Sequence, residues 1–484
     1  MSITSALTNA LSGLTAQSKA AELVSSNIAN VSTPGYSRRE VILASRTVGT
    51  PGQGVQVLGV QRNVNLPLIG DRRLAQSASG DADTRAAFFK RVEKTIGTPD
   101  DAFSISGRAA ALNATLIEAS SHPEAEPRLG NVLSSAKALA RQIGFASRDV
   151  QAARTAANTE IAKEVSLLNT SLARVAKLNG QISNGIAVRQ DVSSLQDQRQ
   201  LTVDQIAKII PIREVQQPEG GVFLYTDSGA SLLDMTAAVF GFTATHSVTP
   251  SSLNGAGLSG LTLNGNPIGT SGENSYILGG TLGANFAVRD ELGVTAQAQL
   301  DAMARDLIER FADPTLDSTR APGDPGLFTD SGVAFDVLLE VGLSQRLVIN
   351  AAVDPEQGGA VSRLRDGLGA TTIGPVGNTT LLNDWRAALT SPRAPLSGGF
   401  TSDARSFAGL SGDFLNAVAS SRLDADGDAT YAAARLDTFT VMEAELGVDT
   451  DSEMQSLLHI EQAYAANAKV ISAVQDMIQA VLDI

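Results

Sequence analysis

The stretch that decides the fold is residues 450–484, TDSEMQSLLHIEQAYAANAKVISAVQDMIQAVLDI. Mostly apolar residues recur there at alternating steps of three and four, the a/d spacing of a helix that packs on another helix. This seam consists of Leu457, Ile460, Tyr464, Asn467, Ile471, Val474, Ile478 and Val481. Thr450 and Glu453 have the spacing of a capping box, so the sequence predicts that the helix begins there.

The opposite end of the chain carries a similar seam. Its members are Ile3, Leu7, Ala10, Leu14, Gln17, Ala21, Val24, Ile28 and Val31. Residues 30–35 end the helix, because Pro34 restricts the preceding residue and a Pro-Gly pair favours a turn. Neither terminal helix would bury enough surface to be stable alone. The simplest fold therefore pairs the two ends of the chain.

Each seam has one polar interruption, Gln17 in the first helix and Asn467 in the last. Polar residues at a or d positions cost stability and fix the register of helix pairing. If the helices run antiparallel, the two side chains would lie near each other, and we expect them to set that register. The same periodicity also fits an ordinary intramolecular coiled coil that serves only the stability of one subunit.

The residue composition and the hydrophobic period change twice along the interior of the chain. Residues 37–60 predict a small hairpin, and residues 64–210 are mostly helical by period, with Asn184-Gly185 expected to break the longest run. Residues 211–285 are rich in Gly, Ser, Thr and Asn with short apolar runs, which is typical of a β domain. We therefore predict a mainly α fold with an inserted β-rich outer domain. The segments are 1–33 with 448–484 (terminal coiled coil), 34–210 with 286–447 (discontinuous helical domain, in which 335–400 give no clear pattern) and 211–285 (β-rich).

Composition narrows the function. The net charge of −14 disfavours nucleic-acid binding, and the lysines are scattered with no basic stripe apparent. The chain contains no cysteine, so disulfides and thiolate zinc sites are excluded. It shows no cleavable signal peptide and no apolar run of the ~20 residues that span a bilayer. This evidence alone would predict a cytoplasmic protein without membrane insertion.

Candidate catalytic and ligand-binding residues are scarce. The histidines (122, 246 and 459) lack metal-ligand spacing, and no phosphate-binding or nucleophile motif is present, so we predict no catalytic residue and no cofactor. Asp424, Asp426 and Asp428 resemble the start of a calcium loop. However, Gly427 stands at the fourth position rather than the sixth, and Arg435 occupies the twelfth, where a Glu is needed. These aspartates are a weak cation candidate in what we expect to be a solvated turn between helices.

Both ends also carry family signatures. Residues 26–36, SNIANVSTPGY, resemble the N-terminal signature of the flagellar rod, hook and hook-associated proteins, and the continuation Tyr36-Ser37-Arg38-Arg39 resembles the hook-associated branch at the hook–filament junction. Residues 447–471, GVDTDSEMQSLLHIEQAYAANAKVI, resemble the matching C-terminal end. Interior pieces around Asn179, Asp197 and Asp301 agree. Two departures are Glu461, where Gln is common, and a β region that is short for the family.

The resemblance implies a structural subunit, not an enzyme, that joins hook to filament and is required for filament assembly. It implies export by the flagellar type III apparatus without a cleaved signal, an extracellular place in the flagellum, and terminal helices that form the inner tube. Its implied partners are the hook protein, a second hook-associated protein, other copies of itself and a cytoplasmic export chaperone on the C-terminal helix. The proposed assembly residues are the whole second seam together with residues of the N-terminal region, namely Ile3, Leu7, Leu14, Gln17, Val24, Asn27, Ile28, Asn30, Thr33, Pro34, Gly35 and Tyr36.

Three alternatives remain open from the sequence. The chain could be another flagellar axial protein (hook or distal rod), a cytoplasmic coiled-coil scaffold, or an enzyme carried on the inserted domain, for which no convergent acid, base or nucleophile is found in residues 211–400. Because lone terminal helices bury little surface, we also expect both ends to be largely disordered until neighbours cover their seams.

Overall fold

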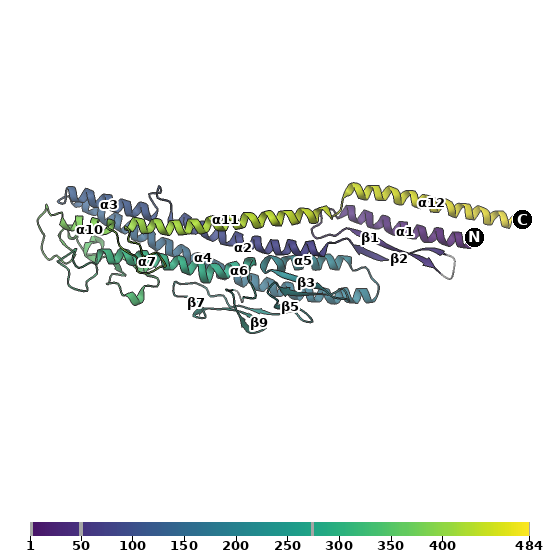
Figure 1. The fold of residues 1–484 in the computed structure, drawn as a ribbon, viewed down its shortest axis with the longest axis horizontal. Helices are drawn as coiled ribbons and strands as arrows, with labels where there is room; N and C mark the ends of the chain where they lie inside the picture. Colours follow the sequence, from purple (N-terminus) through teal and green to yellow (C-terminus); the bar gives the residue numbers. More distant parts are fainter. Residues whose placement is uncertain (1–2, 48–51, 273–274, 484) are drawn as a thin grey trace.

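The computed structural model describes residues 3–47, 52–272 and 275–483. The chain forms a long rod of helices with both termini at the same tip (Figure 1). We call the narrow end of the rod the tail: helices α1 (Ile3–Ala29) and α12 (Thr450–Leu482) with the hairpin of β1 (Arg39–Thr47) and β2 (Gly52–Arg62). The remainder, which we call the body, is wider and contains the other helices and the small sheets.

The body is built around α4 (Glu126–Ala187), a helix of 62 residues. The expected break at Asn184-Gly185 is wrong, because the helix continues to Ala187 with Gly185 buried against Val192. The other body helices are α2 (Leu66–Ile96), α3 (Ile105–Ser121), α5 (Ser193–Ile209), α6 (Gly280–Ala287), α7 (Gly293–Phe311), α8 (Leu343–Arg346), α9 (Arg363–Asp366), α10 (Thr380–Thr390) and α11 (Phe407–Glu445). A π-helical turn, Val288–Leu292, joins α6 to α7.

Two hydrophobic cores follow each other along α4. The first lies between α3, α7, α10, α11 and the first half of α4, and includes the fully buried rings of Trp385, Phe311 and Phe414. The second lies between the latter half of α4, α5 and the small sheets, with Leu168, Leu224 and other fully buried side chains. Residues 335–400, which gave no sequence pattern, contribute short helices, α10 and one strand (Leu347–Ile349) to the first core.

Residues 211–268 form short strands, as expected for the β-rich region. The strands are β3 (Ile212–Gln216), β4 (Val222–Thr226), β5 (Ser231–Leu233), β6 (Phe240–Gly241), β7 (Leu253–Asn254), β8 (Gly257–Leu258), β9 (Leu261–Leu263) and β10 (Asn266–Ile268), with β11 (Phe328–Asp330) and β12 (Leu347–Ile349) pairing elsewhere. The small sheets of residues 211–268 lie along α4 (Figure 1). Asn169 and Asn179 of α4 each bond both the backbone N–H and C=O of one strand residue, Phe240 and Val222. The predicted domain boundaries stay a prediction.

Helices α1 and α12 run antiparallel (Figure 1). A Cβ placed on Gly13 would lie 2.8 Å from the Asn467 amide nitrogen, while Asn27 donates to Glu453 at 3.2 Å. Moving 14 residues forward along α1 between these contacts moves 14 residues back along α12. The two terminal helices therefore stay in one register over this length.

The start of α12 differs from the expected capping box. The N-cap is Asp449, whose carboxylate accepts from the backbone N–H of Asp451 at 3.0 Å. Thr450 is already the first helical residue, so Glu453 lies one position too far along the helix to return a bond to the cap. The side chain of Glu453 points to α1 instead.

Candidate assembly site

The base of the tail is organised by one buried asparagine. Asn27 is 1% exposed, and all of its side-chain hydrogen-bonding positions are occupied. Its amide nitrogen donates to the backbone oxygen of Arg39 (3.0 Å) and to Glu453 (3.2 Å). Its oxygen accepts from the Arg39 N–H (3.0 Å) and from the Tyr36 hydroxyl (2.9 Å). One side chain on α1 thus binds the hairpin, the preceding loop and α12.

Glu453 is the acidic partner in this cluster and is fully buried. Its second oxygen accepts from Arg38 Nε at 2.6 Å. Burial by itself would lower the pKa of Arg38, but the hydrogen bond and charge of Glu453, with the charge of Glu40, outweigh burial and raise it. A buried carboxylate with two donors is held firmly, because loss of the Arg38 guanidinium would leave its charge without compensation and loss of Asn27 would leave one of its oxygens without a donor.

The loop between α1 and the hairpin is fixed by its signature residues. Asn30 donates to the Ser26 carbonyl (2.9 Å) and accepts from the Thr33 hydroxyl (3.2 Å). Gly35 has a φ of 74°, and a Cβ there would collide with the side chain of Leu201 on α5. Only glycine suits both conditions, since it tolerates positive φ and has no Cβ. Pro34 is exposed at the turn.

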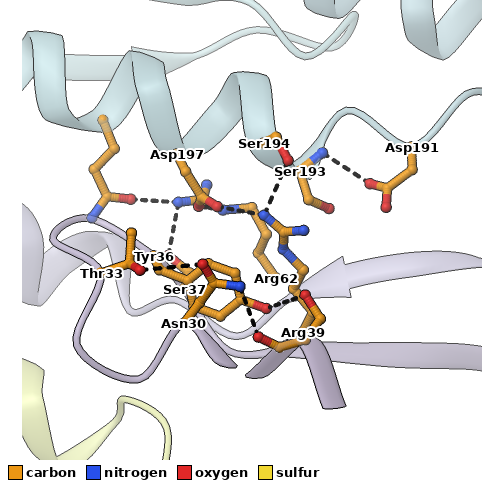
Figure 2. A network of polar contacts seen from close by, with 12 residues as sticks. Asn30, Thr33, Tyr36, Ser37, Arg39, Arg62, Asp191, Ser193, Ser194 and Asp197 are labelled. Atoms are coloured by element: carbon orange, nitrogen blue, oxygen red, sulfur yellow. Dashed lines mark hydrogen bonds and ion pairs between the residues drawn. The ribbon is translucent and has the colours of Figure 1, made fainter. Parts of the chain in front are cut away.

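A second cluster joins the hairpin to the body. Figure 2 shows Arg39 and Arg62 of the hairpin reaching Asp197 on α5, with N–O distances of 2.7 and 2.8 Å. Arg62 also donates to Ser37 (2.9 Å) and to Gln200 (2.6 Å). Burial lowers the pKa of Arg62 below its usual value, although Asp197 opposes this. The Arg39 guanidinium also stacks 4.7 Å from the Tyr36 ring centre.

The predicted seams are only partly buried. In α1, Val24 is buried, Leu7, Leu14, Gln17 and Ile28 are half-buried, and Ile3 is exposed. In α12, Val474 is buried, Leu457, Ile460, Asn467 and Ile471 are half-buried, and Tyr464, Ile478 and Val481 are exposed. Val31 lies beyond the end of α1 at Ala29. The seam is uncovered at the terminal turns, where Ile3, Ile478 and Val481 are exposed, whereas Ala10 and Val474 one or two turns further in are buried.

The two polar interruptions are offset by about one turn. Asn467 lies against Gly13, four residues before Gln17, and donates to the carbonyl of Ala463 in its own helix (3.0 Å). Neither side-chain amide bonds the other, although both residues are described. Their coupling stays a prediction, and Gly13 is the residue that Asn467 contacts directly.

The turn expected for the weak cation candidate, residues 424–428, is not formed. Asp424, Asp426 and Asp428 lie within the continuous helix α11 and not in a turn. Successive alternate residues of a helix point in different directions, so three such carboxylates do not converge. Asp426 bonds Arg422 at 2.6 Å, and no cluster of three metal-ligating side chains occurs in residues 3–47, 52–272 and 275–483.

Sequence reasoning missed part of the site. Glu453 was interpreted as a cap, and Arg38, Arg39, Arg62 and Asp197 were not expected to form ion pairs. The available signal was the position of these charges: Arg38 and Arg39 directly follow the glycine turn, and Asp197 begins a signature piece on α5. Pairing partners 158 and 415 residues apart could not be read from spacing.

The comparisons with known proteins agree with this layout. A model of the flagellar hook-associated protein FlgK helical domain matches residues 89–327. A model of the flagella basal body rod protein matches residues 7–36, and one of the flagellar basal body rod FlgEFG protein C-terminal region matches residues 445–484. The matches at the two ends cover the helices that pair in the tail.

The chain is also similar to individual curated proteins. Flagellar hook-associated protein 1 of Salmonella typhimurium is 29% identical over 231 residues, which cover 46% of this chain and 41% of that protein. Its namesake in Bacillus subtilis is 27% identical over 244 residues, 47% of each chain. The flagellar hook junction protein FlgK from Burkholderia pseudomallei superposes with a TM-score of 0.44 at 21% identity, over 54% of this chain and 47% of that one. The matches span less than half the length of these curated relatives.

The chain is a rod of helices whose two ends pair into one tail, with apolar side chains left exposed there. The chain is similar to the flagellar rod and hook axial proteins at both ends, and to the hook-associated proteins among them over residues 89–327. No described helix has the length and apolar content needed to cross a membrane.

Proposed function

We propose that this chain is a structural subunit of the bacterial flagellum that forms the junction between hook and filament and is required for filament assembly. The observation that supports this best is the tail. Its helices match flagellar models at both ends of the chain and are clamped together at the base by Asn27 and Glu453.

The exposed apolar residues of the tail support a role in assembly. On α12, Leu458 is 56% exposed, Met477 53% and Val481 65%, and on the hairpin Leu58 is 61% exposed. Soluble monomers rarely leave such a series of large apolar side chains uncovered along one narrow end. Neighbouring subunits around a tube would bury them.

The proposed partners follow from this place in the flagellum. They are the hook protein on one side, a second hook-associated protein on the other and further copies of this chain. We include an export chaperone that covers α12 before export, since this helix has the most exposed apolar surface in the tail. The proposed location is outside the cell, reached by flagellar type III export without a cleaved signal peptide.

A deletion strain tests the proposal. We expect hooks without filaments and flagellin monomers in the medium, with filaments restored by the unchanged chain and the chain itself present in sheared flagella. Loss of hooks would instead indicate a hook or rod protein. Normal filaments, with the chain retained in the cytoplasm, would contradict the proposal and favour a cytoplasmic scaffold.

A further inference from the structure

The outer face of α4 carries exposed basic side chains, which corrects the expectation that no basic stripe exists. They are Arg141, Arg148, Lys163, Arg174 and Lys177. At 3.6 residues per turn their spacings place them within about a quarter of the helix circumference. We call this face the α4 stripe. The stripe is not apparent in the sequence, because consecutive members lie up to 15 residues apart.

No exposed acidic residue interrupts the stripe on this helix. Asp149 is occupied by Arg91 (2.7 Å), Glu160 by Lys163 (2.8 Å), and Glu164 is buried against Asn285. The other four stripe cations, all in described parts of the chain, have no carboxylate partner. A helix that merely faces solvent usually mixes both charge signs.

The stripe also contains apolar and small residues. Phe145 is 51% exposed and Leu167 48%, and Ala152 and Ala156 are exposed on the same face. Aromatic residues and arginine are enriched at protein–protein interfaces, and small residues allow a close approach of backbones. The composition of the stripe therefore indicates a contact surface.

A second surface has the complementary character. A shallow groove runs between α2 and α11, and its floor contains Ala78, Ala82, Phe89, Ala425 and Ala432. Asp424, Asp428 and the 72% exposed Tyr431 lie at its edge. Neither aspartate has a cation partner in the described chain. The lining also contains Arg85, whose charge is paired with Asp81 at 2.9 Å, so the unpaired charges of this groove, which we call the α2/α11 groove, are those of the two aspartates.

The two surfaces lie at the same level along the rod. On α2, Arg91 bonds Asp149 of α4 at 2.7 Å, and Glu93 bonds Arg422 of α11 at 2.6 Å. Arg91 and Glu93 are two residues apart on α2, so their partners Asp149 and Arg422 lie at nearly the same height along the long axis of the rod. Arg148 of the stripe and Asp424 of the groove are within two residues of these markers.

We propose that the α4 stripe of one copy packs into the α2/α11 groove of the neighbouring copy, with Arg148 facing Asp424 and Asp428. Charge complementarity and equal height select a second copy of this chain, placed side by side, as the occupant. Contact between two different surfaces repeats around a ring or helix instead of closing as a dimer. The inference rests on the proposed function, which places copies next to each other around a tube.

A charge exchange tests the contact in the deletion strain. Arg148→Glu and Asp428→Arg alone should each lower the fraction of filamented cells about tenfold, and the double variant should return it to within about twofold of the parent. Arg386→Glu, an exposed helical arginine outside the stripe, is the control and should have no effect. Single variants with normal filaments, or a double variant without recovery, would overturn the contact.

Cross-linking gives an independent readout because the chain has no cysteine of its own. In sheared flagella, Arg148→Cys with Asp428→Cys should form disulfide-linked dimers and larger species, whereas Arg386→Cys with Asp428→Cys should not. Monomers alone would overturn the contact even when filaments form. If the unchanged chain does not restore filaments, the proposed function fails instead, so the two failures are distinguishable.

Discussion

The body and the tail differ in how much apolar surface they bury. In the body, the largest fully buried side chains are Trp385, the arginines 154 and 289, and phenylalanine rings such as Phe311, which lies 6.2 Å from Trp385 between ring centres. In α12 only Glu453 and Val474 are buried, and the better buried of the two is the glutamate. The body is stabilised by its own hydrophobic cores, while the tail combines a few buried apolar side chains, such as Leu23, Val24 and Val474, with a polar clamp at one end.

This difference indicates that the two regions contribute differently to the molecule: the body provides folding free energy, and the clamp fixes an arrangement. A hydrophobic core is non-directional and provides most of the folding free energy. A buried polar cluster contributes less net energy, but it accepts only one arrangement of its partners. The clamp therefore fixes the direction and register in which the tail leaves the body, and the uncovered apolar side chains beyond it remain for neighbours.

The largest expected effect is a loss of core packing in the body. Trp385→Ala should lower the free energy of unfolding by about 3–5 kcal/mol, because it leaves a cavity among fully buried side chains. Val481→Ala, at an exposed tail position, should change it by less than about 0.5 kcal/mol. Urea unfolding of the monomer followed by circular dichroism measures both. Equal losses would remove the contrast between the regions.

Next in size is the clamp itself. Glu453→Ala removes the acceptor of Asn27 and Arg38 and should lower the local opening free energy of the tail base by about 3 kcal/mol. Global unfolding of the body should not change. Hydrogen exchange of residues 23–30 measures the effect, with exposed Glu461→Ala on the same helix as the matched control. Unchanged exchange in the first variant would show that Glu453 is not a clamp.

A smaller effect is expected where the tail meets the body. Asp197→Asn keeps the shape of the side chain but removes the charge that accepts from Arg39 and Arg62, and should cost about 2 kcal/mol in hairpin docking. Faster exchange in residues 39–47 with unchanged exchange in α4 is the expected signature. A global loss of stability would place Asp197 within the body core instead.

The smallest effect concerns a buried carboxylate in the body. Burial raises the pKa of Glu164 above its ordinary value. The folded state therefore favours the protonated form, and stability falls as the pH rises through the folded-state pKa. Glu164→Gln removes this loss, so the variant should be slightly more stable than the parent at pH 7 and no longer so below about pH 4. Urea midpoints at both pH values test this, and a pH-independent difference would contradict it.

Periodicity predicted the elements that are long and regular. The two seams, the helical character of residues 64–210 and the β texture after Pro211 follow from local patterns, and the terminal signatures indicated the family. The sequence did not identify Asp449 as the cap, because Thr450 is also a capping residue and lies three residues before Glu453, the spacing of a capping box. The acidic run at 424–428 was mistaken for a turn because glycine and aspartate disfavour helices, whereas packing of Ala425 and Ala432 maintains α11.

Contacts between distant segments were beyond sequence reasoning. Asn27 was expected to matter for assembly, but its bonds to Arg39 and Glu453 depend on the hairpin folding back and on the register of α12. The α4 stripe likewise becomes visible only when a 62-residue helix is known to be continuous. One chain shows which residues share a face only after the elements that carry them are fixed.

The most direct test of the account is hydrogen exchange along the tail of the unassembled, full-length monomer. We expect amides of residues 16–27 and 453–460 to exchange about a hundredfold more slowly than those of residues 3–9 and 475–482, because the clamp holds the base while the distal halves await neighbours. Uniformly fast exchange along both helices would contradict the clamp. Uniformly slow exchange would contradict the role of neighbouring subunits in completing the tail.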